Sequence, residues 1–466
     1  MKLLVIGGSH AGFSAVNAFR SINADAEVLI LEKNVTSHPF ISAGIKLALN
    51  GALKNAEEVN FEHFEGQPNS EFRQGVIVER VDAENKKVYG HVLADGSAFE
   101  EPYDKLVYAL GSSPRVPAFV GANLDRVVFV KDEQDAEEIN HLVKGFGKKH
   151  ALVYGGGPVG VELAAALIHY GSKVTYVTRS ENLMQRYFDK PIQLDLEEQL
   201  TKHGVNLRKK QEVEFVEEAG KKITVHFNDN TEEVFDFMAI ASGLQPNTML
   251  LAGQVDMNPK GAILVNEQMQ SSNPDIYVVG DAGVINGKHD QYFPLMSAAL
   301  KMGRVAGYAL AGLDVHILPL LRTMGFTVFD RYYYKTGLNA RTAEKIEGWN
   351  STMIELKTPA TISTITGDKD IHAVLIYDDT VGTVRGAQIA TDAPAASEII
   401  ATLANATSAR LTVEELAFLD TYFESELNLP YSAANRLGEI GMIERATHRG
   451  EFNVVDDSYV GKRFTK

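Results

Sequence analysis

The pattern of apolar and polar residues divides the chain into alternating strands and helices. Residues 2–6 (KLLVI) form a short, mostly apolar run of the kind that a buried parallel strand shows. A glycine-rich turn follows at 7–12, and the next run, FSAVNAFRSI, has apolar residues at helical spacing. The run EVLILE then predicts a second strand, which ends at Glu32. The order of strand, glycine turn, helix, strand and acid is typical of a dinucleotide-binding βαβ unit.

The residues of this first turn suit a bound pyrophosphate. Gly7, Gly8 and Gly12 let backbone N–H groups approach phosphate oxygens at the start of a helix. Glu32 follows Gly12 by 20 residues, the spacing at which an acid accepts hydrogen bonds from a ribose. Ser9 stands where the usual second glycine would be. A glycine turn alone is often only a tight turn, but its context with Glu32 favours nucleotide binding.

The same pattern returns at residues 151–177. The run ALVY predicts a strand, residues 155–160 (GGGPVG) form a turn with complete glycine spacing, and VELAAALIHYG predicts a helix before the strand KVTYV. Two such units predict two dinucleotides. A flavin that is reduced by a nicotinamide nucleotide is the commonest arrangement of that kind.

Three later segments fit this division. Residues 103–117 (YDKLVYALGSSPRVP) and 236–247 (DFMAIASGLQPN) each predict a strand that runs into a glycine turn. Residues 276–283 (IYVVGDAG) place Asp281 just after a buried strand, where its carboxylate can accept a hydrogen bond from a hydroxyl. Each segment alone fits a plain connection, but their order supports the two-unit interpretation.

The chain contains no cysteine. Thiol nucleophiles, disulfides and thiolate metal sites are therefore excluded. The 13 histidines show neither HxxxH nor HExxH spacing, so we expect no metal site.

The net charge and the hydropathy of the chain further restrict the kinds of partner that it can bind. The net charge of -16 argues against nucleic acid or an anionic membrane as a partner. No apolar run approaches the roughly 18 residues that would span a bilayer. The start, MKLLVIGGSHAG, lacks a signal-peptide cleavage site, so we expect a cytoplasmic protein.

The order of these segments resembles the pyridine nucleotide-disulfide oxidoreductase superfamily, especially its NADH oxidases, NADH peroxidases and coenzyme A-disulfide reductases. GGSHAG is similar to the opening of that branch, including its histidine, His10. YDKLVYALGSSPRVP and IYVVGDAG resemble its later FAD-contact motifs. Residues 329–338 (FDRYYYKTGL) resemble the entry to its C-terminal dimerisation domain. Residues 417–434 lie where that branch has an aromatic segment that reaches the partner's active site.

The resemblance implies an α/β fold with two Rossmann-like nucleotide-binding domains, for FAD and NAD(P), and a C-terminal α+β dimerisation domain. The FAD domain would comprise residues 1–115 and 250–320, with the NAD(P)H-binding domain inserted at 116–249. The dimerisation domain would span 321–466. In this family the dimer is two-fold and this last domain covers the open face of the flavin, so a homodimer is expected.

The resemblance also implies which residues contact FAD and NAD(P)H. In relatives, the glutamate at Glu162 helps to hold the nicotinamide carboxamide; otherwise it is an acid on the first helical turn, favoured by the helix dipole. The expected cofactor contacts are Gly7, Gly8, Ser9, Gly12, Glu32, Lys33, Gly111, Ser112, Pro114, Asp281, Gly155, Gly157, Pro158, Gly160, Glu162, Thr178, Arg179 and Gly243.

One departure from the family changes the expected chemistry. Relatives carry a single redox cysteine beside the flavin in a segment like FLSCG. Here residues 40–44 read FISAG, so Ala43 stands at the cysteine position and Ser42 precedes it. A serine hydroxyl cannot cycle through sulfenate or disulfide states. Peroxidase or disulfide reductase activity by the family mechanism is thereby excluded. The expected catalytic positions are His10, Ser42 and Ala43, although His10 also fits a helix-cap position that is kept by packing.

Two further departures concern the second unit. Pro158 stands where the family commonly has a tyrosine that gates the nicotinamide pocket, although proline also suits the first turn of a helix. Thr178 stands where NADH-preferring members carry an acid. Thr178 and Arg179 offer a hydroxyl and a cation, which suit the 2′-phosphate of NADPH, although Arg179 also fits a solvated surface position.

The function that these residues favour is an FAD-dependent NAD(P)H oxidase. Hydride passes from NAD(P)H to FAD, and without a thiol the reduction of oxygen stops at hydrogen peroxide, with His10 as the proton donor. One alternative is an NAD(P)H dehydrogenase with a quinone or another acceptor. Another is a catalytically degenerate flavin-binding regulator, which the loss of the cysteine favours and the retention of two nucleotide turns opposes.

Overall fold

A computed structural model describes residues 1–35, 64, 66, 68–119, 121–144, 148–286, 292, 294–346 and 348–450. Ser42 and Ala43 lie outside these residues. The chain forms two compact units, each of three segments. The first comprises Met1–Pro117, Phe129–His141 and Ser242–Leu320, and the second Ala118–Val128, Leu142–Ala241 and Leu321–Lys466.

The first unit is built on a five-stranded parallel sheet with the order β19-β7-β1-β2-β3. Its central strands are apolar and fully buried, as expected of a parallel sheet that is covered on both faces. The strands are β1 (Lys2–Ile6), β2 (Glu27–Leu31), β3 (Ser70–Arg73), β7 (Lys105–Tyr108) and β19 (Ile276–Val278).

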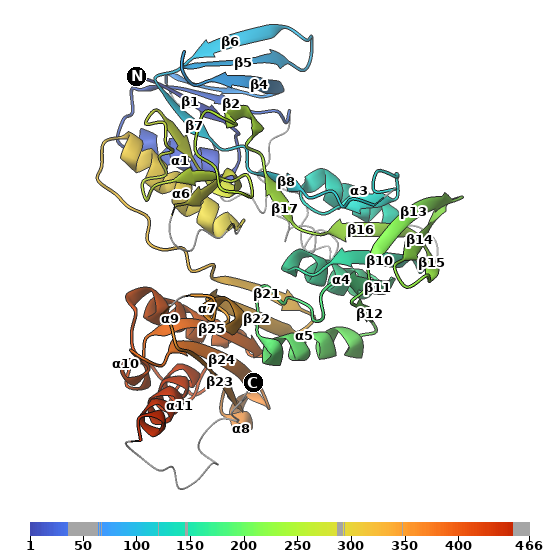
Figure 1. Cartoon of the computed structure of the whole chain (residues 1–466), viewed down its shortest axis with the longest axis vertical. Helices are drawn as coiled ribbons and strands as arrows, with labels where there is room; N and C mark the ends of the chain where they lie inside the picture. Colours follow the sequence, from blue (N-terminus) through green and yellow to red (C-terminus); the bar gives the residue numbers. More distant parts are fainter. Residues whose placement is uncertain are drawn as a thin grey trace. The chain divides into compact units, whose positions relative to one another are not determined.

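Helices α1 (His10–Arg20) and α6 (Met296–Leu310) lie side by side against this sheet (Figure 1). Gly307 permits their close approach, because a Cβ there would lie 2.2 Å from the carbonyl oxygen of Ala15. Ser14 donates a hydrogen bond to the Leu300 carbonyl across the pair, at 2.9 Å. The packing therefore fixes α1, the helix whose N-terminus follows the first glycine turn.

Three smaller sheets complete the first unit. One has three antiparallel strands, β4 (Val76–Asp82), β5 (Lys87–Val92) and β6 (Ala98–Pro102). The other two are pairs of short strands, β8 (Ser112–Pro114) with β17 (Leu244–Pro246) and β18 (Ile263–Val265) with β20 (Gly283–Ile285).

The second unit contains another mostly parallel sheet, with the order β12-β11-β10-β16-β9. Its strands are β9 (Val127–Phe129), β10 (His150–Gly155), β11 (Lys173–Thr178), β12 (Asn206–Lys209) and β16 (Phe237–Ala241). The helices associated with this sheet are α4 (Pro158–His169) and α5 (Lys190–Lys202), whereas α3 (Glu133–Val143) belongs mostly to the first unit. A three-stranded antiparallel sheet follows, with β13 (Val213–Ala219), β14 (Lys222–Phe227) and β15 (Glu232–Phe235).

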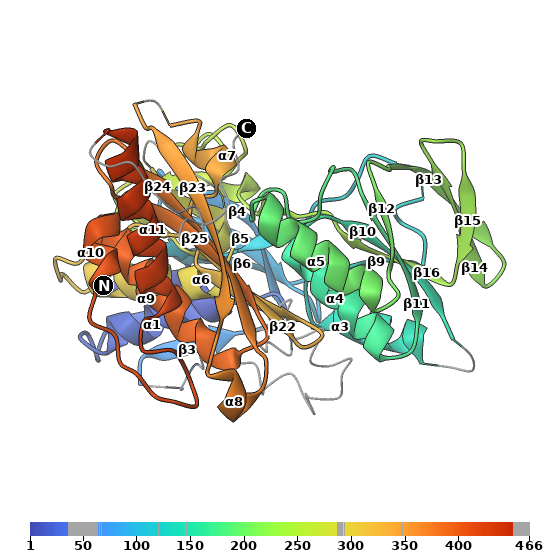
Figure 2. The same ribbon diagram turned by 90° about the horizontal axis from the view of Figure 1, so that it is seen from below.

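A five-stranded antiparallel sheet with the order β21-β22-β25-β24-β23 forms the C-terminal part of this unit. Helices α9 and α11 pack on one of its faces (Figure 2). The strands are β21 (Met324–Val328), β22 (Arg331–Gly337), β23 (Ser351–Pro359), β24 (Asp370–Asp378) and β25 (Val384–Thr391). The helices are α7 (Ala340–Ala343), α8 (Ser363–Thr366), α9 (Ser397–Ala409), α10 (Val413–Ala417) and α11 (Ala433–His448).

These sheets confirm the predicted α/β fold class with two Rossmann-like arrangements. The predicted division into three domains stays a prediction. In the part of the chain that the structure describes, no helix is long and apolar enough to cross a membrane.

The sequence pattern placed the start of both nucleotide-binding helices too late. α1 begins at His10, so this residue opens the helix instead of lying within the turn. α4 begins at Pro158, and Glu162 therefore lies on its second turn, not its first. Glycine and proline in the first turn concealed these helix starts, although proline is well tolerated there.

Candidate dinucleotide sites

In the first glycine turn, backbone segments approach one another closely. A Cβ on Gly7 would lie 2.4 Å from the carbonyl oxygen of Ala109, and one on Gly12 would lie 2.1 Å from that of Gly7. Gly7 also has a positive φ of 104°. Neither position accepts a side chain, so the turn keeps the narrow shape through which a pyrophosphate approaches backbone N–H groups. The residues fit one end of FAD.

Glu32 is held directly beside this turn. Its carboxylate accepts hydrogen bonds from the backbone N–H of Gly8 and of Asn34, both at 2.8 Å. β1 and β2 are adjacent parallel strands, and this pairing brings Glu32 next to the start of α1. Lys33 is exposed. The position of Glu32 is the one from which an acid accepts hydrogen bonds from a ribose.

A polar cluster in the first unit joins Ser112 and Asp281. The Ser112 hydroxyl donates to Asp281 Oδ2 at 2.6 Å. Lys131 Nζ lies 3.2 Å from Ser112 Oγ and 3.4 Å from Asp281 Oδ2. Gly111 and Gly243 flank the paired strands β8 and β17 and have positive φ angles of 62° and 105°. The structure thus brings together two segments that the sequence singled out separately.

Lys131 is a site residue that the sequence pattern missed. It follows β9 and precedes α3, and its backbone N–H donates to the Asp135 carboxylate at 2.7 Å. Burial is the main cause that raises the pKa of Asp135 to about 6. A lysine between a strand and a helix matches no nucleotide-binding motif in the sequence. Lys131 is identified by its contact with Asp281 in the structure.

The predicted catalytic positions are only partly described. His10 is the first residue of α1 and is buried, with 6% of its surface exposed. Ser42 and Ala43 lie outside the described residues, so the structure does not test them. His10 therefore lies at the helix N-terminus that follows the first turn, and its role stays a prediction.

The glycines of the second turn differ in how closely other atoms surround them. A Cβ on Gly155 would lie 2.3 Å from the Ala241 carbonyl oxygen, and one on Gly160 would lie 2.7 Å from the Tyr176 hydroxyl. At Gly156 the nearest atom would be Thr178 Oγ1 at 3.0 Å. The outer glycines thus serve packing, whereas around the middle of the turn the nearest atoms are side-chain atoms at 3.0 Å or more.

The start of α4 suits an anion. Gly157 is its N-cap and Pro158 its first residue, so no side chain caps the helix. The N–H groups of a first helical turn have no partner within the helix and carry the positive end of its dipole. The residues fit the pyrophosphate of a second dinucleotide.

The end of β11 carries the predicted specificity residues. Thr178 is buried, and its hydroxyl accepts a hydrogen bond from the Ser180 N–H at 3.2 Å. The Lys210 N–H donates to the Ser180 carbonyl at 3.2 Å. Arg179 is exposed. Arg179 and Lys210 therefore both lie next to the Ser180 backbone, and the Lys210 ammonium pairs with Glu181 at 3.0 Å. The sequence pattern missed Lys210.

A segment before α5 crosses the second turn. The Met184 N–H donates to the Gly156 carbonyl at 3.0 Å. The Tyr187 hydroxyl lies 3.7 Å from the place where a Cβ on Gly157 would stand. Burial raises the pKa of Tyr187, so its phenol stays protonated at neutral pH. Tyr187 could not be found from the sequence, because no motif or periodicity includes it.

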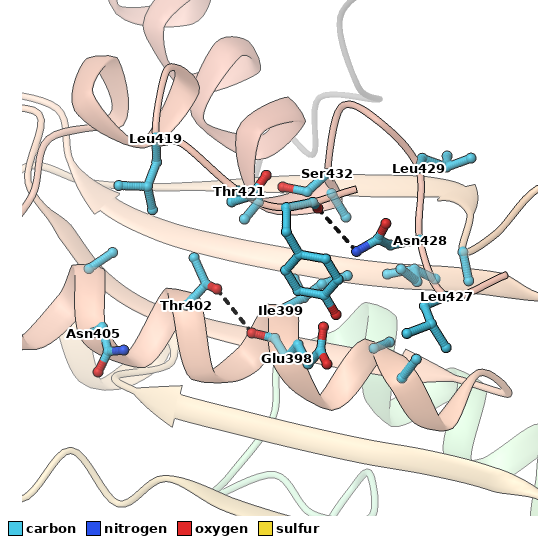
Figure 3. Close-up of a pocket in the computed structure, with 18 of the residues that line it drawn as sticks. Glu398, Ile399, Thr402, Asn405, Leu419, Thr421, Leu427, Asn428, Leu429 and Ser432 are labelled. Carbon is cyan, nitrogen blue, oxygen red and sulfur yellow. Dashed lines mark hydrogen bonds between the residues drawn. The ribbon is translucent and has the colours of Figure 1, made fainter. Parts of the chain in front are cut away.

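A separate cavity of about 440 Å³ lies in the C-terminal part of the second unit. It lies between α9, which contributes Glu398, Ile399 and Thr402, and residues 419–434 (Figure 3). The predicted site residues do not line it. Among the described residues, no group of three or more His, Asp or Glu side chains is arranged to hold a metal ion.

Comparison with known proteins agrees with this geometry. Residues 1–303 match the family described as pyridine nucleotide-disulphide oxidoreductase. An NADH oxidase of Enterococcus faecalis is 30% identical over 448 residues, which cover 95% of this chain and 99% of that protein.

Two solved structures are similar over almost the whole chain. The water-forming NADH oxidase of Lactobacillus brevis, bound to NADH, has a TM-score of 0.90 and 27% identity, covering 96% of this chain and 100% of that one. An engineered water-forming NADPH oxidase derived from it, bound to NADPH, has a TM-score of 0.90, 28% identity and the same coverage.

The chain therefore belongs to the pyridine nucleotide-disulphide oxidoreductase family. It is a flavin-dependent NAD(P)H oxidoreductase of the NADH oxidase type, with FAD and NAD(P)H as its cofactors.

Proposed function

We propose that this protein is an FAD-dependent NAD(P)H oxidase that reduces oxygen by two electrons and releases hydrogen peroxide. The observation that carries the proposal is the absence of cysteine from a chain that otherwise aligns with an NADH oxidase over 99% of that protein's length. Reduction of peroxide to water by a protein thiol needs a sulfenate, and no residue here forms one. The product would thus differ from that of the water-forming structural relative.

Each of the two glycine turns would bind a different cofactor. The first turn and Glu32 would hold the adenosine diphosphate part of FAD, and Asp281 with Ser112 and Lys131 would hold a hydroxyl-bearing part. The second turn and the start of α4 would hold the pyrophosphate of NAD(P)H. Bound FAD supplies the capacity to accept a hydride and to pass two electrons to an acceptor. His10 would hold the proton that the reduced acceptor takes up.

We further propose that NADPH is the preferred reductant. The engineered oxidase that is bound to NADPH carries Ala-Arg-Ser in place of the consecutive residues Asp-Ala-Met. This chain has the same Arg-Ser pair in Arg179 and Ser180, directly after β11. A cation and a hydroxyl suit a 2′-phosphate, and an acid at Thr178 would repel it.

Thr178→Glu should raise the KM for NADPH at least about tenfold more than the KM for NADH, because a like-charge contact costs on the order of a few kcal/mol. Steady-state kinetics with both nucleotides measure the difference. Thr178→Gln is the control, since it keeps the size of the glutamate side chain without its charge. Equal effects of Thr178→Glu on both nucleotides would mean that Arg179 and Ser180 only face solvent.

A homodimer remains part of the proposal. The segment 417–434 exposes large apolar side chains, including Phe418 at 76%, Tyr422 at 53% and Phe423 at 49%. Clustered exposed aromatic residues are typical of protein interfaces. The same segment forms one wall of the cavity in Figure 3.

Anaerobic stopped-flow reduction tests the proposed function. The flavin should be bleached by NADPH, more slowly by NADH, and should regain its colour when oxygen is added. A protein without bound FAD, or one whose flavin is reduced by neither nucleotide, would contradict the proposal.

A further inference from the structure

Helix α5 is anchored to the C-terminal sheet at several points along its length. Asp189 precedes the helix, Asp195 lies within it, and His203 follows it. His203 stacks on Phe329, with 3.7 Å between ring centroids. All of these residues belong to the second unit, so the contacts lie within one compact body. Figure 2 shows α5 and α9 on opposite sides of the C-terminal sheet.

The first anchor joins Asp189 to Gln388 on β25. The Asp189 N–H donates to Gln388 Oε1 at 2.7 Å, and the Gln388 amide donates back to the Asp189 carboxylate. That carboxylate also accepts the Ala340 N–H at 3.0 Å. Gln388 is fully buried and Asp189 is 8% exposed. Because no solvent competes for these buried hydrogen bonds, the Gln388 amide holds the start of α5 at a fixed distance and orientation relative to β25.

The second anchor joins Asp195 to Arg331 on β22. The guanidinium binds the carboxylate through two hydrogen bonds, at 2.7 and 2.6 Å, and the Tyr333 hydroxyl adds a third at 2.8 Å. Burial opposes ionisation of Asp195, but His372 and Arg331 outweigh it and lower its pKa to about 2. The carboxylate is therefore ionised at neutral pH, and the two-pronged pair is rigid.

The pleat of the sheet explains why these anchors share a face. Side chains alternate across a strand, so Arg331, Tyr333 and Lys335 point to the same side of β22. Lys335 pairs in register with Gln388 on β25. Burial lowers the pKa of Lys335 to about 8. The C-terminal sheet thus presents a buried polar row to the nucleotide-binding part of the unit.

The anchored start of α5 is directly connected to the second glycine turn. Met184 bonds to Gly156, and the Tyr187 hydroxyl stands beside Gly157. Phe188 packs on Phe326 of β21, with 5.9 Å between ring centroids. Only a few residues separate the turn contact at Met184 from the Gln388 anchor at Asp189. A shift of the anchor would therefore move the segment that borders the turn.

We propose that Gln388 and Arg331 are positioning residues for the nicotinamide nucleotide. They belong to the C-terminal sheet, touch no part of the glycine turn, and act by holding α5 and residues 184–188 against it. The inference rests on the proposed assignment of the second turn to NAD(P)H. It gives the C-terminal sheet a role in the reductive half-reaction within a single chain.

Gln388→Ala in the full-length, FAD-loaded protein tests the inference. The rate constant of anaerobic flavin reduction at limiting NADPH should fall at least about tenfold, because small misplacements of a bound reactant are costly. FAD content should stay unchanged, as should reoxidation by oxygen of flavin reduced with dithionite. Arg331→Lys, which keeps the charge but loses the two-pronged geometry, should act in the same direction.

Arg445→Lys is the matched control. Arg445 is another buried arginine of the C-terminal part, but its guanidinium bonds to the Asp379 carbonyl at 3.0 Å and to the Glu414 carboxylate, away from α5. Its replacement should lower the melting temperature without slowing reduction. If Gln388→Ala and Arg331→Lys left reduction unchanged, or Arg445→Lys slowed it equally, the inference would fail. A wild-type flavin that neither nucleotide reduces would instead refute the proposed function.

Discussion

Gly156→Val should slow anaerobic reduction of the flavin by NAD(P)H by about 100-fold or more, while FAD stays bound. The valine side chain would project into the middle of the second turn, where Thr178 Oγ1 lies 3.0 Å from its Cβ. A small shift of that hydroxyl would accommodate the valine, but the nucleotide pyrophosphate would lose its close approach to the backbone. A misplacement of about 1 Å is enough to cost on the order of 100-fold in rate.

Stopped-flow absorbance of the flavin measures this effect, with FAD content determined on the same sample. Gly156→Ala provides a graded control and should slow reduction less. If Gly156→Val lost FAD but was still reduced normally after FAD was restored, the two turns would serve the opposite cofactors.

Asp281→Ala should weaken FAD binding by about 10- to 100-fold, as expected from the loss of a charged hydrogen bond worth roughly 1.5–3 kcal/mol. Removing the carboxylate deletes the acceptor of the Ser112 hydroxyl and the ion pair between Asp281 and Lys131. Dialysis followed by absorbance at the flavin band measures retention.

Asp275→Ala is the matched control for this change. Asp275 precedes β19 as Asp281 follows it, and it pairs with Lys86 and Lys105. Loss of this carboxylate should leave FAD in place. Equal loss of FAD from both variants would indicate general destabilisation of the first unit, and full retention by Asp281→Ala would remove Asp281 from the site.

Much of the fold was predictable because its signals are local. The apolar runs of β1, β2, β10 and β11 and the glycine spacing between them lie within short windows, and the structure contains these strands close to the predicted residues. The starts of α1 and α4 were missed by a few residues, since glycine and proline obscure a helical pattern at its first turn.

Contacts between distant residues could not be predicted in this way. Lys131 meets Asp281 across 150 residues, and Asp189 meets Gln388 across 199. Neither lysine nor glutamine carries a periodic or motif signal at these positions. Their partners are set by tertiary packing, which a pattern of hydrophobic and polar residues does not encode.

The proposed product, hydrogen peroxide, rests on the sequence alone, through Ala43 and the absence of cysteine elsewhere. Ala43→Cys should divert part of the electron flux from peroxide to water. The gain should be limited, because a useful thiolate also needs a lowered pKa and a clear approach to the peroxide.

The ratio of hydrogen peroxide released to NAD(P)H oxidised under air, measured with catalase controls, shows whether the reduction of oxygen stops at two electrons. We expect a ratio close to one for the native protein and a lower ratio for Ala43→Cys. Native protein that made only water would require a route without a thiol and would contradict the proposed function. Native protein that consumed no oxygen but rapidly reduced quinones would contradict it too, and would identify a dehydrogenase.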